Sequence, residues 1–403
     1  MIRFFPDGKG GIYVNRRIII FTGKGGVGKS SVAAAHAIKS ASQGKNTLLV
    51  STDMAHNLGD IFEQKLGREI CNIRPNLDLY EIDPQYVMEN DFEDIMKYLG
   101  SLLSQKDVIG LEDVGMLPGM EELFSLLRIS QLYRSDVYDR IIVDCAPTGE
   151  TLSLLKFPEL LSWYMEKLFP IGKVGVRMLA PVSRHLFKIE MPNKDAMNDI
   201  EKMFVKLMEL EELLKDRDVT SIRIVTTPEK MVVEETKRNY MYMNLYDFNV
   251  DGLYINRILP RDIGNEFFDE WLNIQQKYII EITETFTALP IYRIPWYEEE
   301  LKGEDNISRI VRDVLTDDHI FDAAIINDRE RFEQTDEGYD LRVSIPGADK
   351  KDIDLYQAST DIVIKTGNFK RNIPLPNILR DHVVSGAGYE NGVLKISFVK
   401  GDN

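Results

Sequence analysis

Short apolar runs alternate with segments of helical periodicity through most of the chain. Buried strands are predicted at residues 17–21, 46–51, 140–144, 250–257 and 291–295, and residues 221–229 are predicted to be a further strand that ends in a turn. Apolar residues between these runs recur every three or four positions, as at 31–38 and 234–245, which is the spacing of a helix that packs on one face. Apolar strands separated by helices are typical of a mostly parallel sheet covered on both faces. We therefore expect an α/β fold over residues 16–315.

The pattern changes after this region to strict alternation with a period of two residues. Residues 339–345 and 361–365 alternate apolar and polar positions, and the turn pair Pro346-Gly347 follows the first of them. The sequence therefore predicts a second domain, an all-β sandwich over residues 331–403. An acidic linker at 316–330 would join it to the α/β domain, and residues 1–15 would form an N-terminal extension.

Two stretches of the α/β domain are too long to be simple connections and are predicted to be helical insertions. They cover residues about 85–135 and 153–215 and are rich in methionine. In the second, Met203, Leu207 and Leu210 have the spacing of one helical face. Such a face either packs in an ordinary core or lines an adaptable apolar groove, because methionine fits irregular shapes. The sequence leaves both alternatives open.

A glycine-rich segment between the first predicted strand and the following helix carries the most specific chemistry. This segment, which we call the glycine loop, reads Gly23-Lys24-Gly25-Gly26-Val27-Gly28-Lys29-Ser30. Two glycines four residues apart, followed by Lys and Ser, form the phosphate-binding pattern of P-loop NTPases. Loop amides and the positive end of the helix would cradle phosphate, Lys29 would contact the β- and γ-phosphates, and Ser30 would bind Mg²⁺. The loop residues and Ser31 are the predicted contacts to ATP.

Two carboxylates follow predicted strands at the edge where ligands bind in open α/β sheets. Asp53 follows residues 46–51, where it would orient and deprotonate the attacking water, or alternatively cap a helix. Asp144 ends the strand at 140–144 and has the position of a Walker B residue, which holds Mg²⁺ through a water. The sequence thus predicts a metal site formed by Ser30 and Asp144.

Composition narrows the classes of partner. The chain has 403 residues and a net charge of −16, which disfavours binding to nucleic acid or to anionic lipid. Its two cysteines, Cys71 and Cys145, have no metal-ligand spacing and fit a reducing compartment. The first residues lack the apolar core of a signal peptide, and no apolar run is long enough to cross a bilayer. We expect a cytoplasmic protein that is not integral to a membrane.

Longer motifs resemble one family. Two motifs of this chain resemble motifs of the ArsA-type ATPases, which drive arsenite pumps or target tail-anchored proteins. They are the glycine loop with Lys24 at its start and the run from Asp144 to Leu152. The resemblance implies a homodimer in which Lys24 reaches the partner's nucleotide, Asp53 acts on water, and Asn256 and Pro295 contact adenine. In the targeting branch, a helical region corresponding to 153–215 binds the transmembrane segments of clients.

The chain departs from the family pattern at several points. Met54 and Glu150 stand where Pro and His are usual, and the Cys-x-x-Cys zinc site of the eukaryotic dimers is missing. Residues 331–403 resemble the α-crystallin domain of small heat-shock proteins, because they share its Pro-Gly, Leu-Pro and Asn-Gly-Val-Leu elements. We expect a Mg²⁺-dependent ATPase coupled to hydrophobic clients. The alternatives are an arsenite or antimonite efflux energiser with a membrane partner, and a holdase-like binding module in which ATP is structural.

Overall fold

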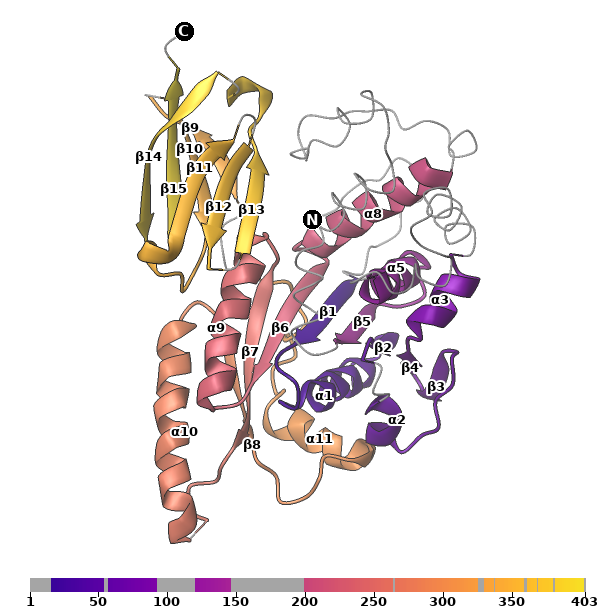
Figure 1. The fold of residues 1–403 in the computed structure, drawn as a ribbon. Coiled ribbons are helices and arrows are strands. Elements are labelled where there is room, and N and C mark those ends of the chain that lie inside the picture. Colours follow the sequence, from indigo (N-terminus) through magenta and orange to yellow (C-terminus); the bar gives the residue numbers. More distant parts are fainter. Residues whose placement is uncertain are drawn as a thin grey trace, which may run out of the picture.

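A computed structural model describes most of the chain. The described residues are 16–53, 57–92, 120–145, 199–263, 265–324, 330–336, 338–358, 361–367, 369–379 and 381–401. The predicted N-terminal extension, most of both predicted insertions and the motif residues from Ala146 to Leu152 lie outside these ranges. The described parts form an α/β body and a separate β-rich body, as Figure 1 shows.

The α/β body contains an eight-stranded sheet in the order β3-β4-β2-β5-β1-β6-β7-β8. Its strands are β1 (Arg17–Thr22), β2 (Thr47–Ser51), β3 (Cys71–Arg74), β4 (Leu77–Glu81), β5 (Arg140–Asp144), β6 (Thr220–Thr226), β7 (Val250–Ile258) and β8 (Ile291–Pro295). All neighbouring strands pair in parallel except β3 with β4. This architecture confirms the predicted fold class, and β3 and β4 are strands that the apolar pattern did not reveal.

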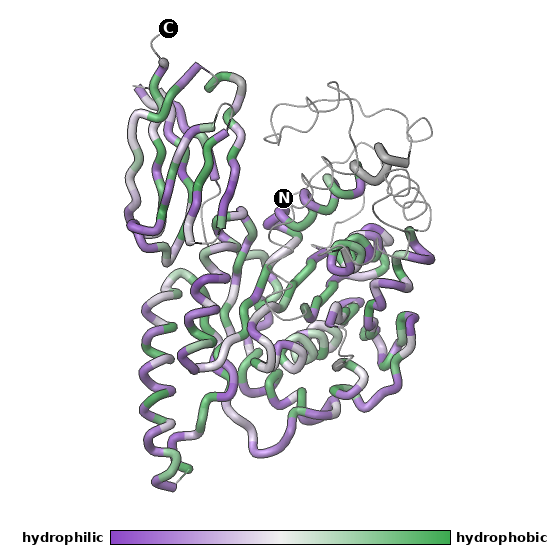
Figure 2. Tube along the Cα trace, in the orientation of Figure 1, coloured by the Kyte–Doolittle hydropathy of each residue, from purple (hydrophilic) through white to green (hydrophobic). Residues whose placement is uncertain are grey.

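Helices cover both faces of the sheet, because side chains of each central strand alternate between two cores. In β1, Ile18 and Ile20 enter one core, whereas Ile19 and Phe21 enter the other. The first core contains residues of α3 (Pro84–Asn90), α5 (Met120–Arg134), α8 (Asp199–Lys215), α9 (Lys230–Leu245) and α10 (Glu266–Thr285). The second contains residues of α1 (Lys29–Ser42), α2 (Asn57–Phe62) and α11 (Gly303–Asp313). Figure 2 shows the apolar strands between these helices.

The second body is an antiparallel β-sandwich. One sheet has the order β14-β15-β10-β9 and the other the order β11-β12-β13. The strands are β9 (Arg331–Gln334), β10 (Tyr339–Ser344), β11 (Ile353–Ala358), β12 (Asp361–Thr366), β13 (Phe369–Pro374), β14 (His382–Glu390) and β15 (Val393–Lys400). Asn391 and Gly392 both have positive φ and join β14 to β15, as expected for Asn-Gly in a two-residue hairpin turn.

The sandwich packs against the end of α9. The Tyr246 hydroxyl donates to the Lys370 carbonyl oxygen at 3.0 Å, and the Arg371 guanidinium donates to the Leu245 carbonyl. The start of the predicted linker is also fixed to the α/β body, because Arg17 Nη1 donates to the Phe321 carbonyl at 3.1 Å. The sandwich therefore has defined contacts with the helix that follows β6.

The described parts of the predicted insertions are helical. In the second, α8 buries Leu207, Leu210 and Leu214 against the sheet. Residues 93–119 and 146–198 are outside the described ranges, so the choice between groove and core stays a prediction there. Every described helix is too short or too polar to span a lipid bilayer.

Candidate nucleotide site

The glycine loop connects β1 to α1, and its glycines are required by close contacts. Gly23 has φ +152°, and a Cβ there would lie 2.1 Å from the carbonyl oxygen of Val225. Gly28 has φ +90°, and its Cβ would lie 2.3 Å from Asn256 Nδ2. The α-helix begins immediately afterwards at Lys29, so its first N–H groups face the loop. The arrangement is a strand, a tight bend and a helix N-terminus, which together suit a phosphate.

Lys29 is buried beneath this bend. Its side chain is buried, and Nζ donates to the Lys24 carbonyl oxygen at 3.3 Å. The contact joins the two ends of the loop and places the ammonium group inside its curve. A cation at this position would meet the phosphate oxygens of a bound nucleotide.

Asp144 lies at the end of β5 beside the loop and has unusual electrostatics. It is fully buried, and neither carboxylate oxygen has a hydrogen-bond partner among the described residues. Burial raises the pKa of Asp144 to about 7, and the neighbouring Ser30 hydroxyl and Lys29 ammonium only partly oppose this rise. An unpaired buried carboxylate costs free energy unless a cation compensates it. The pair Asp144 and Ser30 therefore fits Mg²⁺, a hard cation that prefers oxygen ligands.

Asp53 enters the same cluster from the neighbouring strand. In the register of β2 and β5, Ser51 is opposite Asp144, and Asp53 follows two residues later. The Asp53 N–H donates to Ser51 Oγ at 3.1 Å, and the charge of Asp53 contributes to the raised pKa of Asp144. Helix α2 is described from Asn57 onward and residues 54–56 lie outside the described ranges, so the alternative in which Asp53 caps a helix stays a prediction. The structure thus brings together Asp53, Asp144, Ser30 and Lys29.

Asn256, near the end of β7, supports the glycine loop by a hydrogen bond to its main chain. Its Nδ2 donates to the Val27 carbonyl oxygen at 2.8 Å, and its Oδ1 accepts from the Arg257 N–H at 2.9 Å. Both functions of the buried amide are therefore used by main-chain atoms in this conformation. Sequence reasoning missed this supporting contact, because nothing in the local pattern shows that β7 ends under the loop. Contact with adenine stays a prediction.

Two other predicted residues lie at the margin of the cluster. Lys24 Nζ is 3.8 Å from Glu235 Oε2 of α9, and the Lys24 side chain is 37% exposed. Glu235 is a neighbour that the sequence did not suggest. Pro295 ends β8 opposite Ile258, and the next residue, Trp296, donates its N–H to the Ile258 carbonyl at 2.8 Å. The contact of Pro295 with a base also stays a prediction.

The cysteines do not form a site in the described chain. Cys145 is buried, and burial raises the pKa of its thiol to about 12. Cys71 is half-buried in β3, an edge strand three places from β5 in the sheet order. Within the described ranges, no group of three or more His, Cys, Asp or Glu side chains is arranged to hold a metal ion.

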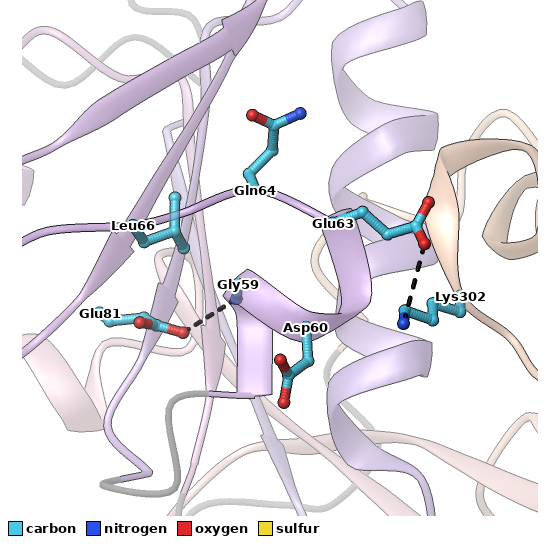
Figure 3. Close-up of a pocket in the computed structure, with 7 residues that line it drawn as sticks. All are labelled: Gly59, Asp60, Glu63, Gln64, Leu66, Glu81 and Lys302. Carbon is cyan, nitrogen blue, oxygen red and sulfur yellow. Dashed lines mark hydrogen bonds and ion pairs between the residues drawn. The ribbon is translucent and has the colours of Figure 1, made fainter.

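A separate cavity of about 380 Å³ lies beside α2. Figure 3 shows its lining residues, which include three carboxylates and Lys302. Glu81 Oε1 accepts from the Gly59 N–H at 3.0 Å, and Lys302 Nζ is 3.8 Å from Glu63 Oε1. Because no residue of the glycine loop lines it, this cavity is not the phosphate site.

Comparisons with known proteins agree with this geometry. The profile of the anion-transporting ATPase family matches residues 16–316, and that of an HSP20-like domain found in ArsA matches residues 336–398. A relative in Aquifex aeolicus named as an arsenical pump-driving ATPase is 34% identical over 380 residues, which are 91% of this chain and 95% of the relative. A similarly named protein of Chlorobaculum tepidum is 35% identical over 95% of this chain and 96% of its own length. The ATPase get3 of Pyrenophora tritici-repentis is 29% identical over 73% of this chain and 89% of its own length.

Proposed function

Because this chain belongs to the anion-transporting ATPase family, we propose that it is a cytoplasmic, Mg²⁺-dependent homodimer that couples ATP hydrolysis to subunit closure. The observation that supports this most directly is Asp144, a buried carboxylate without a hydrogen-bond partner among the described residues, next to Lys29 and Ser30. Such a group gains most when a bound cation compensates its charge. Mg²⁺ would supply charge neutralisation on the phosphates.

The remaining roles follow from position. Loop amides and Lys29 hold the phosphates, Ser30 and Asp144 hold the metal, and Asp53 orients water and accepts its proton. Lys24 acts on the nucleotide of the partner, as the family resemblance implies. Its present neighbour Glu235 is a surface partner, and such pairs contribute at most about 1 kcal/mol, so Lys24 is available to move.

The client is a hydrophobic protein segment in this proposal. Residues 153–215 would change shape on closure and would take up or release the segment, in the manner of the targeting branch that the sequence resembles. The domain limits that we propose are 16–315 for the ATPase, 316–330 for the linker and 331–403 for the sandwich. Tyr246 donates to the sandwich at Lys370, and Arg371 of the sandwich donates to Leu245 at the end of α9. These contacts support a sandwich that stays attached to the α/β body during the cycle.

Asp53→Asn is the direct test of the reaction. The variant keeps the size and a hydrogen-bonding group but cannot accept a proton. We expect turnover to fall at least about a hundredfold, with ATP affinity within about threefold of the wild type. Calorimetry with ATP and Mg²⁺ measures affinity, and phosphate release measures turnover. Normal turnover in Asp53→Asn would contradict the assignment, and absence of ATP binding in the wild type would remove the proposal as a whole.

An arsenite or antimonite efflux role is the second candidate, because relatives carry the arsenical pump-driving name. A soft metalloid site needs several thiolates. The whole chain has two cysteines, and Cys145 is buried with a raised thiol pKa. Turnover that rises with added antimonite would favour this candidate.

A holdase-like module is the third candidate, and Lys29→Ala separates it from the coupled ATPase. This change removes the phosphate-binding ammonium. If the variant suppresses aggregation of an apolar client as well as the wild type does, client binding is independent of ATP, as the holdase-like candidate requires. If suppression disappears, binding is coupled to the nucleotide.

A further inference from the structure

The C-terminal half of α9 is buried on every side. All residues from Asn239 to Tyr246 are buried, a stretch of more than two helical turns. A helix that packs only on a sheet leaves one face open to solvent. The ring of Tyr240 meets that of Phe286 at the end of α10, with the centroids 5.2 Å apart, so the α/β body covers one part of this half. The rest of the helix surface needs a second cover.

The hairpin formed by β12 and β13 is that second cover. Its contacts with α9, which we call the hairpin contact, join Thr366 to Met241, Phe369 to Tyr242, Lys370 to Tyr246 and Arg371 to Leu245. Figure 1 shows the hairpin directly above this end of α9. The last carbonyl groups of a helix have no partner inside it, and a cation suits the negative end of the helix dipole. Arg371 supplies both a donor and a charge there, so the sandwich completes the packing and the capping of α9.

The opposite end of α9 lies beside the glycine loop. Glu235 Oε2 is 3.8 Å from Lys24 Nζ, and the Thr236 hydroxyl is 2.9 Å from that of Thr226 at the end of β6. Glu235 and Tyr242 are seven residues apart, which is close to two turns, so they lie on one face of the helix. A helix transmits a displacement from one end to the other because it is stiff. The face of α9 that the hairpin covers therefore also carries the neighbour of Lys24.

Lys24 has two alternative positions in the proposed cycle. Its ammonium group either stays with Glu235 of its own subunit or reaches the phosphates of the partner's nucleotide, as the proposed function requires. The two side chains are 37% and 25% exposed, and a pair this exposed shifts an equilibrium by at most about fivefold. Such a shallow balance responds to a small displacement of α9. The position of the helix therefore influences how often Lys24 is released.

We propose that the sandwich restrains ATP hydrolysis through α9. The hairpin contact holds the helix where Glu235 faces Lys24, so Glu235 is a positioning residue that keeps this cation away from the partner's nucleotide. The proposal rests on the proposed function, because Lys24 has to leave Glu235 to act across a dimer. The sandwich stays attached during the cycle and sets its rate. Any change that weakens the hairpin contact therefore raises turnover.

Arg371→Ala tests the restraint in the full-length protein, and Lys365→Ala is the matched control. Both changes remove one positive charge from the hairpin, but Lys365 lies over the Tyr356 ring within the sandwich, 5.3 Å from its centroid. At saturating ATP and Mg²⁺ we expect kcat to rise about two- to fivefold in Arg371→Ala and to equal the wild-type value in Lys365→Ala. Calorimetry should give ATP affinities within about threefold of the wild type for both variants, because the restraint acts on turnover and leaves binding unchanged.

Tyr246→Phe is a milder form of the same test. It removes only the hydroxyl that donates to the Lys370 carbonyl, so the buried ring stays in place. Its kcat should rise less than that of Arg371→Ala but remain above the wild-type value. This variant carries the test if Arg371→Ala does not fold.

Glu235→Gln tests whether the hairpin contact acts through Lys24. Glutamine keeps the size of the side chain but loses the charge that attracts Lys24, so kcat should rise by a similar factor. Adding Arg371→Ala to Glu235→Gln should give no further rise, because both changes act on one contact. Glu234→Gln is the control, since Glu234 pairs with Lys237 at 3.2 Å and its loss should leave kcat unchanged. A purely structural role of the sandwich would instead lower kcat by the same factor with or without Glu235.

Each failure has a separate meaning. A kcat at or below the wild-type value in Arg371→Ala and Tyr246→Phe, with ATP binding intact, overturns the restraint and leaves the proposed function standing. Increases that multiply in the double variant also overturn it, because the hairpin would then act by another route. A wild type that does not bind ATP, or normal turnover in Lys24→Ala, overturns the proposed function and this inference with it.

Discussion

Asn256 holds Val27 by a hydrogen bond of 2.8 Å, so the end of β7 supports the middle of the glycine loop. The two residues are 229 positions apart in the chain. The loop conformation therefore depends on its own glycines and on β7, which is two places from β1 in the sheet order. A Cβ at position 28 would lie 2.3 Å from Asn256 Nδ2 and would displace the amide that holds Val27.

Gly28→Ala should abolish nucleotide binding, because the new Cβ would overlap Asn256 Nδ2 at 2.3 Å. Gly26→Ala is a matched control, since Gly26 also has positive φ, +80°, but its Cβ would meet nothing within 4 Å. The loop of the Gly26→Ala control should be destabilised by only about 1–2 kcal/mol, which is what a left-handed backbone conformation costs a residue with a side chain. Calorimetry should show no ATP binding for Gly28→Ala and weakened binding for Gly26→Ala. Equal affinities in the two variants would contradict the steric account.

Asp144 should make the stability of the nucleotide-free protein depend on pH. Its pKa is raised from 3.8 to about 7, so the folded state binds the proton more tightly than the unfolded state does. The resulting stabilisation is complete below about pH 4 and is lost as pH rises through 7. A shift of about three units corresponds to at most about 4 kcal/mol.

Urea unfolding of the wild type and Asp144→Asn at pH 5, 6.5 and 8 measures this effect. The variant has no titrating group at 144, so it should gain stability relative to the wild type as pH rises. Mg²⁺ and ATP should stabilise the wild type at pH 8 but have little effect on the variant, which should also lose turnover. If the free energy of unfolding changes with pH in the same way for both proteins, the charge of Asp144 is already compensated in the nucleotide-free protein.

Lys24 and Asp53 should complement each other across a dimer. Lys24→Ala should bind ATP but lose turnover, as should Asp53→Asn. In a mixture, a heterodimer has one intact site, formed by Asp53 of one copy and Lys24 of the other. Random pairing of equal amounts should therefore restore about a quarter of the wild-type turnover. If the mixture is as inactive as each variant alone, Lys24 acts in the site of its own subunit. Each variant incubated alone is the control for residual activity.

Much of the α/β body was predictable from local patterns. The strands at 140–144 and 291–295 were predicted with the bounds that the structure gives β5 and β8, because buried parallel strands are apolar along their whole length. The predicted strand at 250–257 ends one residue before β7 does. The glycine loop and Asp144 were recognisable because strand, loop and acid occur in a fixed local order. Strands β3, β4, β9 and β11 were missed, and in β3, β9 and β11 the half-exposed side chains leave only a weak apolar signal.

The sequence by itself determined the elements, the phosphate-binding loop and the two carboxylates that follow strands, because each depends on residues close together in the chain. Only the tertiary structure decided that Asn256 supports Val27, that Glu235 faces Lys24 and that Asp144 is fully buried. It also decided that the hairpin of β12 and β13 covers the end of α9, where Tyr246 donates to Lys370. These properties depend on which distant segments the sheet order makes neighbours, and burial and pairing exist only after those segments have met.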